Sequence, residues 1–500
     1  MKTKKYKIAH ILVLIVIAIL FATFIFLRKN FTIINFNEIL FALKYSNKGT
    51  DSGIFISSVF SIFPIATLIF LVLFVLFYDI TFDKRKIITK NNKQIYPFKL
   101  VNNHRKFFTW LLFLLGVFSI FYHLGLCDYL FSSFKESSVI EDNYVNPKKA
   151  EVSFEEKRNL VFILVESLET SMFTKDQGGY FDYELMPELY DLLNDKDSVV
   201  FYDKNKAQTV NMIEGASWTT ASIVSNLSGL PIKADLNNKI YDSTGFMKGT
   251  YALGDLLKDN GYNNEVISGA TTSFGGVKEY FSTHGSYSII DEDSLDEFNL
   301  KMEETDVGKW GFNDNYLFET AKKRLDVLSK EDKPFNLQLV TIDTHFIDGF
   351  VGDYSIKKYD SQYANAYATE SKLIYDFVNW IKRQDYYKNT TIVIAGDHLT
   401  MQSSFFEGLP IKDRYVYNCI INPRNKNGKQ DGRIITALDS YPTIVYAIGG
   451  DIKGDRLGLG VNLFSNESTL AEKYGFKKFN TELKKKSSFY SDLINNKSRD

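Results

Sequence analysis

Three long apolar stretches dominate the first 130 residues of the chain. They cover Ile8–Leu27, Ile56–Tyr78 and Phe107–Leu126, and each supplies the ~20 predominantly apolar residues that span a bilayer. Lysines precede the first stretch, but its apolar run is too long for the core of a cleaved secretory signal. The pattern therefore predicts a membrane domain with three transmembrane helices in residues 1–130, rather than a buried helical hairpin of a soluble protein.

Basic residues between the second and third stretches predict the orientation of these helices. That segment carries Lys84, Arg85, Lys86, Lys90, Lys93, Lys99, Arg105 and Lys106. Basic loops remain in the cytoplasm, and the Lys-rich N-terminus is expected there too. We therefore expect a multi-pass protein of a bacterial inner (cytoplasmic) membrane. Three spans place everything after Cys127 on the periplasmic or extracellular side.

After the apolar stretches, short apolar runs alternate with amphipathic segments. Leu160–Val165 and Thr391–Ala395 have the continuous apolar pattern of strands that are covered on both faces. Ser361–Gln384 carries apolar residues at helical spacing. This alternation predicts an α/β fold with three layers and a mainly parallel sheet.

The length of 500 residues exceeds that of one ordinary domain, so more than one unit is expected. The polar composition of residues 131–158 suits a juxtamembrane linker. The α/β pattern then extends over residues 159–475. Residues 476–500 are Lys-rich and are expected to form a polar C-terminal tail, either a solvated helix or a frayed end.

Composition narrows the possible partners of this domain. The formal net charge of -1 gives no reason to expect a nucleic-acid partner. The two cysteines, Cys127 and Cys419, are too few for a disulfide framework or a thiolate metal cluster. An extracytoplasmic domain has no ATP, so its chemistry must use activated groups already present there, such as phospholipid phosphodiesters.

Acidic residues follow two of the predicted strands. Glu166 comes directly after Leu160–Val165, and Gly396-Asp397-His398 comes after Thr391–Ala395. Ligands of open α/β sheets collect at the carboxyl ends of the strands. Glu166 alone could be a solvated residue that opens a loop, but a second strand that ends the same way favours a site. Oxygen donors with an imidazole suit manganese, zinc or magnesium.

Two threonines, Thr219 and Thr220, precede the apolar helical run Ala221–Leu227. A threonine at a helix start commonly serves as an N-cap. A helix N-terminus is also an anion site, where a hydroxyl activated by a divalent cation can attack phosphate. The pattern leaves both interpretations open for both residues.

A third strand ends in Thr341-Ile342-Asp343-Thr344-His345. The chain has only six histidines, so two of them directly after strands indicate a function, although His345 could also be a buried structural residue. His284 follows a predicted helix, and packing and substrate contact are equally compatible with its position.

Several short motifs, taken in order over about Asn159–Leu463, resemble the alkaline phosphatase/sulfatase superfamily. They are Val165-Glu166-Ser167-Leu168-Glu169, Glu214-Gly215 with Trp218-Thr219, Trp310-Gly311-Phe312, Asp343-Thr344-His345 with Asp348-Gly349-Phe350, Asp397-His398-Leu399 with Met401, Asp439-Ser440-Tyr441-Pro442-Thr443-Ile444, and Leu457-Gly458-Leu459-Gly460. Within this superfamily the chain looks most like the membrane-bound phosphoglycerol transferases that decorate periplasmic glucans. It is more distantly similar to lipoteichoic acid synthases.

The resemblance implies a two-step transfer from phosphatidylglycerol to a sugar hydroxyl of an extracytoplasmic polysaccharide or glucan. Thr219 would attack the phosphorus and release diacylglycerol, leaving a glycerophosphoryl-threonine. By the same resemblance, Glu166, Thr219, Asp397 and His398 would bind the cation, which is expected to be Mn²⁺, with Zn²⁺ or Mg²⁺ possible. His345 would contact the phosphate or the leaving oxygen.

The chain also departs from the family pattern. Ala216 stands where the glucan enzymes have a further threonine, and Lys278 is the only basic residue near the position of a phosphate-gripping arginine of the lipoteichoic acid synthases. Thr220 stays an alternative nucleophile. The run Thr219-Thr220-Ala221-Ser222-Ile223 lacks the Cys or Ser of a C/S-x-P-x-R sulfatase motif. The remaining alternatives are a phosphoethanolamine transferase and a non-catalytic, membrane-anchored glycan-binding module.

Overall fold

The computed structural model describes residues 2–30, 36–45, 52–78, 87–88, 94–95, 101, 103–234, 239–242, 244–406 and 408–497. Its contacts divide the chain into two compact units. Residues 1–36 and 50–130 form the first unit, and residues 37–49 and 131–500 form the second. We call them the membrane unit and the catalytic unit, the second name following the activity that the sequence motifs lead us to expect.

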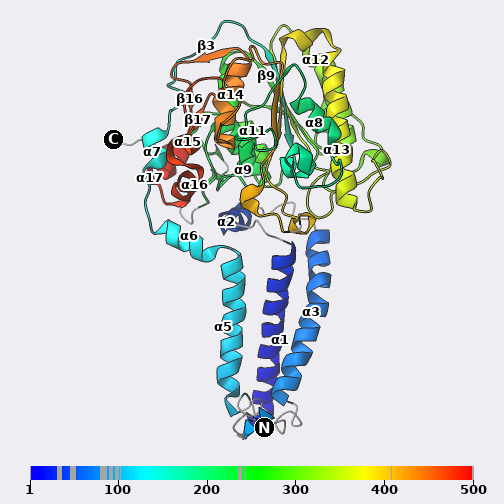
Figure 1. Cartoon of the computed structure of the whole chain (residues 1–500), viewed down its shortest axis with the longest axis vertical. Coiled ribbons are helices and arrows are strands. Elements are labelled where there is room, and N and C mark those ends of the chain that lie inside the picture. Colours follow the sequence, from blue (N-terminus) through cyan, green and yellow to red (C-terminus); the bar gives the residue numbers. More distant parts are fainter. Residues whose placement is uncertain are drawn as a thin grey trace. The chain divides into compact units, whose positions relative to one another are not determined.

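Three long helices make up most of the membrane unit (Figure 1). They are α1 (Lys2–Asn30), α3 (Ser52–Tyr78) and α5 (Arg105–His123). The segments Tyr6–Asn30, Val59–Tyr78 and Arg105–His123 are each long and apolar enough to cross a membrane. This confirms the predicted multi-pass membrane segment, except that the third helix ends at His123 instead of Leu126. The unit also contains β1 (Ile87–Ile88), β2 (Gln94–Ile95) and most of α6 (Leu126–Ser133).

One short helix, α2 (Phe36–Tyr45), lies between α1 and α3 in the sequence. Residues 37–49 nevertheless pack with the catalytic unit. Segments that pack together lie on the same side of a membrane, so an even number of spans must separate them along the chain. The two spans of α3 and α5 satisfy this condition and agree with the orientation expected from the basic residues.

A seven-stranded sheet forms the middle layer of the catalytic unit, in the order β10-β9-β11-β4-β12-β13-β5. The first five strands in this order are parallel, and the last two join by antiparallel pairs. The sheet is therefore mainly parallel, as predicted. The strands are β4 (Asn159–Val165), β5 (Ser198–Val199), β9 (Asn263–Ser268), β10 (Ser288–Ile290), β11 (Phe335–Val340), β12 (Thr390–Gly396) and β13 (Asn418–Ile421).

Helices cover both faces of this sheet, and its central strands are therefore buried on both sides. One face packs on α8 (Pro187–Leu193), α12 (Asp314–Leu328) and α13 (Gln362–Lys382). Figure 1 shows α9 (Thr219–Ser228), α11 (Val277–Thr283) and α14 (Ser440–Ala447) on the opposite side of the sheet. The three-layer α/β architecture predicted from the sequence is confirmed.

The segments expected to be a linker and a polar tail are instead folded parts of the catalytic unit. In residues 131–158, β3 (Val152–Phe154) pairs with β15 (Gly450–Ile452), and α7 (Val139–Asn143) packs near the C-terminus. The tail forms α16 (Phe476–Lys484) and α17 (Ser488–Ile494). Each of these two helices buries apolar residues on one face, among them Phe479 in α16 and Tyr490 in α17, although lysines are frequent elsewhere in residues 476–500.

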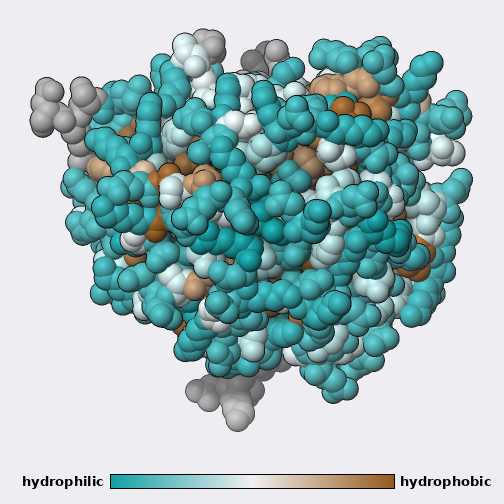
Figure 2. All heavy atoms as spheres, turned by 90° about the horizontal axis from the view of Figure 1, so that it is seen from above, coloured by the Kyte–Doolittle hydropathy of each residue, from teal (hydrophilic) through white to brown (hydrophobic). Residues whose placement is uncertain are grey.

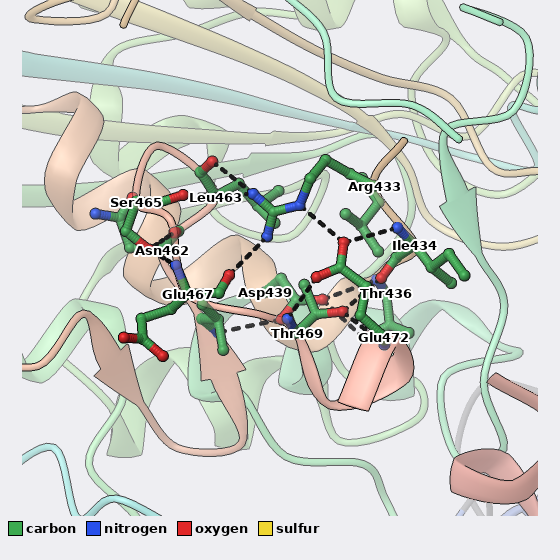
Figure 3. A network of polar contacts seen from close by, with 12 residues as sticks. Arg433, Ile434, Thr436, Asp439, Asn462, Leu463, Ser465, Glu467, Thr469 and Glu472 are labelled. Atoms are coloured by element: carbon green, nitrogen blue, oxygen red, sulfur yellow. Dashed lines mark hydrogen bonds and ion pairs between the residues drawn. The ribbon is translucent and has the colours of Figure 1, made fainter. Parts of the chain in front are cut away.

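A polar network fixes the C-terminal part of the catalytic unit (Figure 3). Arg433 donates to the Glu472 carboxylate at 2.8 Å and to three backbone carbonyls. Glu472 also caps the start of α15 (Leu470–Tyr474) together with Thr469. Asp439 accepts hydrogen bonds from the backbone of Thr436 and Val461. The Asp439-Ser440-Tyr441-Pro442-Thr443-Ile444 motif is thus held by internal partners.

Short elements complete the described part of the catalytic unit. The strands are β6 (Val210–Asn211), β7 (Tyr241–Asp242), β8 (Gly245–Phe246), β14 (Ile435–Thr436), β16 (Arg456–Leu457) and β17 (Gly460–Val461), and the remaining α-helix is α10 (Leu253–Asp259). The face of this unit seen in Figure 2 is mainly hydrophilic, with only scattered hydrophobic side chains. Such a face is typical of a surface that meets water.

Candidate functional site

The strand register brings the predicted site residues to one edge of the sheet. Val165 of β4 pairs with Gly396 of β12. Glu166 and Asp397, the next residues after the two strands, therefore lie side by side at the carboxyl edge of the sheet. Glycine is required at 396, because a Cβ atom there would lie 1.9 Å from the Leu168 carbonyl oxygen. The loop after β4 therefore approaches the end of β12 closely.

Glu166, Asp397 and His398 form a buried cluster with the composition of a cation site. One potential ligand atom from each lies within 4.8 Å of the others. His398 Nε2 lies 3.3 Å from Asp397 Oδ2 and 3.7 Å from Glu166 Oε1. Asp397 Oδ2 is buried and accepts no hydrogen bond from any described residue. A divalent cation would satisfy this oxygen, and two carboxylates with an imidazole suit such an ion.

Backbone and hydroxyl groups hold these side chains in place. Asp397 Oδ1 accepts hydrogen bonds from the backbone N–H of Ser167 at 2.7 Å and of His398 at 2.6 Å. The Ser167 hydroxyl donates to Glu166 Oε1 at 2.6 Å. His398 Nδ1 lies 3.0 Å from the Leu399 carbonyl oxygen, which selects the tautomer that leaves Nε2 as the ligand atom. The cluster is therefore positioned before any ion binds.

Burial and mutual repulsion change the acidity of the cluster. Burial and the neighbouring Glu166 raise the pKa of Asp397 to about 7. Burial would lower the pKa of His398, but Asp397 and Glu166 outweigh it and raise that pKa to about 9. Burial would raise the pKa of Glu166, yet His345 and His398 keep it below its usual value. The protein on its own thus balances its carboxylates with a proton on His398, which a divalent cation would replace.

Thr219 is the first residue of α9, and its hydroxyl faces the cluster. Thr219 Oγ donates to Glu166 Oε2 at 3.2 Å. The N-cap position belongs to Trp218, whose backbone is extended, so Thr219 is not the cap of this helix. The partly exposed Thr219 hydroxyl lies at a helix N-terminus, where backbone N–H groups favour a phosphate.

Thr220 is placed differently from its neighbour. Its side chain is buried, and its hydroxyl donates to the Gly275 carbonyl oxygen at 2.9 Å. A Cβ atom on Gly275 would lie 2.9 Å from that hydroxyl oxygen, so glycine allows the close approach. The two threonines, which the helix-start pattern alone did not separate, therefore differ, since only the Thr219 hydroxyl bonds to a residue of the cluster.

His345 lies within electrostatic reach of the same cluster. Its Nδ1 is 2.6 Å from the Phe346 carbonyl oxygen, and its ring packs edge to face on Trp310 with 4.7 Å between ring centroids. Burial lowers the pKa of His345, although Glu166 opposes this change. A neutral His345 whose Nδ1–H bonds to that carbonyl keeps Nε2 as a proton acceptor.

Two other polar residues have structural roles. His284 is buried, with Nδ1 2.9 Å from Asp255 and Nε2 2.8 Å from the Phe246 carbonyl oxygen, so packing explains it. Tyr363 of α13 is fully buried and bonds to Thr400. It is a core residue because α13 turns this face towards the sheet.

A buried ion pair beside the site could not be predicted from the sequence. Arg414 donates to both carboxylate oxygens of Glu169, at 2.5 and 2.8 Å. Glu169 also accepts from the backbone N–H of Thr400 at 3.1 Å. The pair joins the turn after Glu166 to the segment after His398. Glu169 and Arg414 are far apart in the chain, and no local pattern connects them.

The fold of the catalytic unit is similar to that of solved α/β proteins of the alkaline phosphatase type. An alkaline phosphatase superfamily protein from Vibrio parahaemolyticus superposes with a TM-score of 0.51 at 22% identity, over 67% of this chain and 78% of that one. The lipoteichoic acid synthase LtaP from Listeria monocytogenes gives a TM-score of 0.51 at 16% identity, over 72% of this chain and 99% of that one. These likenesses concern the fold.

The family follows from the sequence comparison. The sulfatase family model matches residues 158–449, more than half of the chain, so the chain belongs to the sulfatase family. It is also 30% identical over 321 residues to phosphoglycerol transferase I of Escherichia fergusonii, and 29% identical over 321 residues to that of Salmonella choleraesuis. Each match covers 62% of this chain and 40% of the relative. The chain thus spans about two fifths of the length of these curated relatives.

Proposed function

We propose that the chain transfers phosphoglycerol from phosphatidylglycerol to a sugar hydroxyl of an extracytoplasmic polysaccharide or glucan. The observation that carries this proposal is the Thr219 hydroxyl, which lies at a helix N-terminus and bonds to Glu166 of the acidic cluster. The named activity of the phosphoglycerol transferase I relatives supports the choice of headgroup. Three membrane-spanning helices give the chain direct access to a lipid donor.

Glu166, Asp397, His398 and Thr219 would hold the divalent cation, for which manganese is our first choice, with zinc or magnesium as alternatives. When bound, the cation lowers the cost of deprotonating the threonine hydroxyl and neutralises charge on the phosphoryl oxygens. The remaining contributions come from the chain itself. The start of α9 orients the phosphate through its backbone N–H groups.

In the first step, a bond forms between Thr219 Oγ and phosphorus as the bond from phosphorus to the diacylglycerol oxygen breaks. The threonine proton leaves, and the diacylglycerol alcohol gains one. In the second step, an acceptor hydroxyl attacks phosphorus and Thr219 recovers its proton. His345, with Nδ1–H bonded to a carbonyl, would take up a proton at Nε2 and through it contact the phosphate or the leaving oxygen.

A parallel assay of two lipids tests the reaction class. The detergent-solubilised full chain is incubated with manganese and either phosphatidylglycerol or phosphatidylethanolamine, and diacylglycerol is measured. We expect release from phosphatidylglycerol. Release only from phosphatidylethanolamine would make the protein a phosphoethanolamine transferase. No release from either lipid would contradict an enzyme of this class and favour a glycan-binding module.

A matched pair of variants tests the nucleophile. We expect Thr219→Ala to reduce diacylglycerol release on the order of 10⁴-fold or more, as for loss of other nucleophiles. Thr220→Ala should retain most activity, because its hydroxyl bonds to a backbone carbonyl. Peptide mass spectrometry of the wild type should find glycerophosphate on the peptide with Thr219. The assignment fails if Thr219→Ala stays active while Thr220→Ala is inactive.

A further inference from the structure

The turn that carries His345 is bonded to the backbone of Glu166. We call residues 341–345 the His345 turn. Thr341 Oγ accepts a hydrogen bond from the Glu166 N–H at 3.1 Å, and Thr344 Oγ donates to the Glu166 carbonyl oxygen at 2.5 Å. Within the turn, the His345 N–H donates to the Ile342 carbonyl oxygen at 2.9 Å. The position of His345 relative to the candidate cation ligand is therefore set by the backbone of this turn.

The start of α12 holds the His345 turn from another side. Asp314, the first residue of this helix, is fully buried. Its carboxylate accepts from the Ile342 N–H at 2.9 Å and from the Asp343 N–H at 2.7 Å. In return, the Asp343 carboxylate accepts from the Asp314 N–H at 2.9 Å. Buried backbone N–H groups need such acceptors, so the shape of the turn depends on Asp314.

The segment before α12 contacts His345 itself. The Trp310 ring packs edge to face on the His345 ring, with 4.7 Å between the ring centroids. Two of the sequence motifs, Trp310-Gly311-Phe312 and Asp343-Thr344-His345, therefore pack together. Residues 310–314 thus contact the His345 turn both at its imidazole ring and at its backbone.

Two further carboxyl groups surround Asp314. Burial raises the pKa of Asp314, and the neighbouring Asp343 and Glu370 raise it further. Glu370 of α13 is fully buried, and burial together with Asp343 raises its pKa to about 8. Such groups bind protons more readily than exposed carboxylates do, and a protonated carboxyl group still offers an acceptor oxygen. The contribution of Asp314 to the turn is therefore that of a hydrogen-bond acceptor.

We propose that Asp314 is a positioning residue for the transfer reaction, and that it acts through His345 by holding the His345 turn against Glu166. The inference rests on the proposed phosphoglycerol transfer, in which His345 contacts the phosphate or the leaving oxygen. The turn bonds to the backbone of Glu166 and not to its carboxylate. Loss of Asp314 should therefore change the rate of transfer and leave the cation in place.

Asp314→Ala removes the acceptor of two backbone N–H groups. In the manganese-loaded full chain, kcat for diacylglycerol release from phosphatidylglycerol should fall about 10-fold to 100-fold, because a displaced side chain assists the reaction poorly. KM and the manganese content should stay near the wild-type values. Asp314→Asn, which keeps an acceptor oxygen, should recover most of kcat. The control is Asp326→Ala at an exposed position of the same helix, which should match the wild type.

A double-mutant cycle determines whether Asp314 acts through His345. His345→Ala alone should lower kcat on the order of 10²-fold or more, since it removes a group that exchanges a proton. Asp314→Ala should then cost no more than about twofold in the His345→Ala background, because the group that it positions is gone. An equal loss in both backgrounds would overturn the inference. Loss of manganese from Asp314→Ala would overturn it too.

Thr344→Val is an independent variant of the same turn, and it decides the question if Asp314→Ala does not fold. Valine keeps the shape of threonine and removes only the hydroxyl that donates to the Glu166 carbonyl oxygen. Its kcat should fall, and Thr344→Ser should recover most of the loss. In the His345→Ala background, valine and threonine at this position should give the same rate. A persistent difference in that background would contradict a role through His345.

The outcomes separate this inference from the proposed function. A wild type that releases no diacylglycerol from phosphatidylglycerol removes both. An active wild type in which the effects of Asp314→Ala and His345→Ala are additive removes the positioning role alone. A His345→Ala variant with the kcat of the wild type removes the role of His345 and this inference with it, while transfer through Thr219 stands.

Discussion

Two buried polar clusters of the catalytic unit differ in how their charges are satisfied. In the C-terminal network of Figure 3, Arg433 pairs with Glu472, and its other nitrogens bond to backbone carbonyls. In the cluster at the sheet edge, Glu166 and Asp397 face each other with one histidine, and Asp397 Oδ2 has no hydrogen-bond donor among the described residues. The charged groups of the first cluster all have partners within the protein. The second cluster needs a further partner for its unsatisfied carboxylate oxygen.

Buried charge therefore has a structural role in the first cluster and a functional role in the second. A paired and fully bonded group holds segments together, and its removal costs stability. A cluster in which two carboxylates share one histidine costs stability while it stands alone, and the protein retains it because a ligand supplies the missing charge. Substitutions in the two clusters should therefore change different observables.

Among substitutions in or beside the two clusters, the largest effect is expected for Asp397→Asn. The substitution removes one of two facing carboxylates, so transfer should fall on the order of 10³-fold. The metal-free protein should be as stable as the wild type or about 1 kcal/mol more stable, because repulsion from Glu166 is relieved. Diacylglycerol release and urea unfolding in chelator measure the two quantities. A large loss of metal-free stability would contradict the comparison.

Next in size is Arg414→Met. This substitution leaves the buried Glu169 carboxylate without its cation, which costs about 3–5 kcal/mol of unfolding free energy. The ion pair lies beside the site but is satisfied internally, so it belongs with the structural cluster. Denaturant unfolding checks the value. An unchanged unfolding midpoint would mean that the effect of a substitution depends on how close the residue lies to the site, and not on whether its charge is paired within the protein.

A smaller loss, about 3 kcal/mol, is expected for Arg433→Met, because Glu472 keeps its two backbone donors. Activity per folded molecule should not change. The matched control is Lys453→Met, which removes an ion pair with Glu151 in which both side chains are 73% exposed. This control should leave the unfolding midpoint unaltered. Reduced kcat in folded Arg433→Met would place this network in the functional class.

The smallest effect concerns the capping threonine of the same network. Thr469→Ala removes the side-chain acceptor for the Glu472 N–H at the start of α15 and should cost about 1 kcal/mol. Thr469→Ser should restore most of that stability. Thermal unfolding of the two variants, run beside the wild type, gives the comparison. Equal stability of the alanine and serine variants would show that the cap contributes little.

Local patterns were sufficient to predict the core of the fold and the acidic cluster. The apolar runs that became β4 and β12 are continuous, and their carboxyl ends meet because parallel strands align. Glu166, Asp397 and His398 therefore came together as expected. The preference for Thr219 over Thr220 came from the family resemblance and not from the local pattern, because the difference depends on which hydroxyl reaches Gly275.

Contacts between distant segments could not be predicted in this way. Residues 37–49 follow an apolar span, and nothing local shows that they pack with the catalytic unit. The lysines of residues 476–500 suggested a solvated tail, although Phe479 and Tyr490 are buried. The partnership of Arg414 with Glu169 depends on the completed sheet. Such pairings are set by tertiary packing rather than by periodicity.

The metal content of the purified full chain tests the central claim most directly. The wild type, Asp397→Asn, His398→Ala and Arg433→Met are loaded with manganese, desalted and measured by elemental mass spectrometry. We predict one ion per chain in the wild type and in Arg433→Met, and a marked loss in Asp397→Asn and His398→Ala. An unchanged metal content in both site variants would contradict the assignment of the unsatisfied cluster as the metal site.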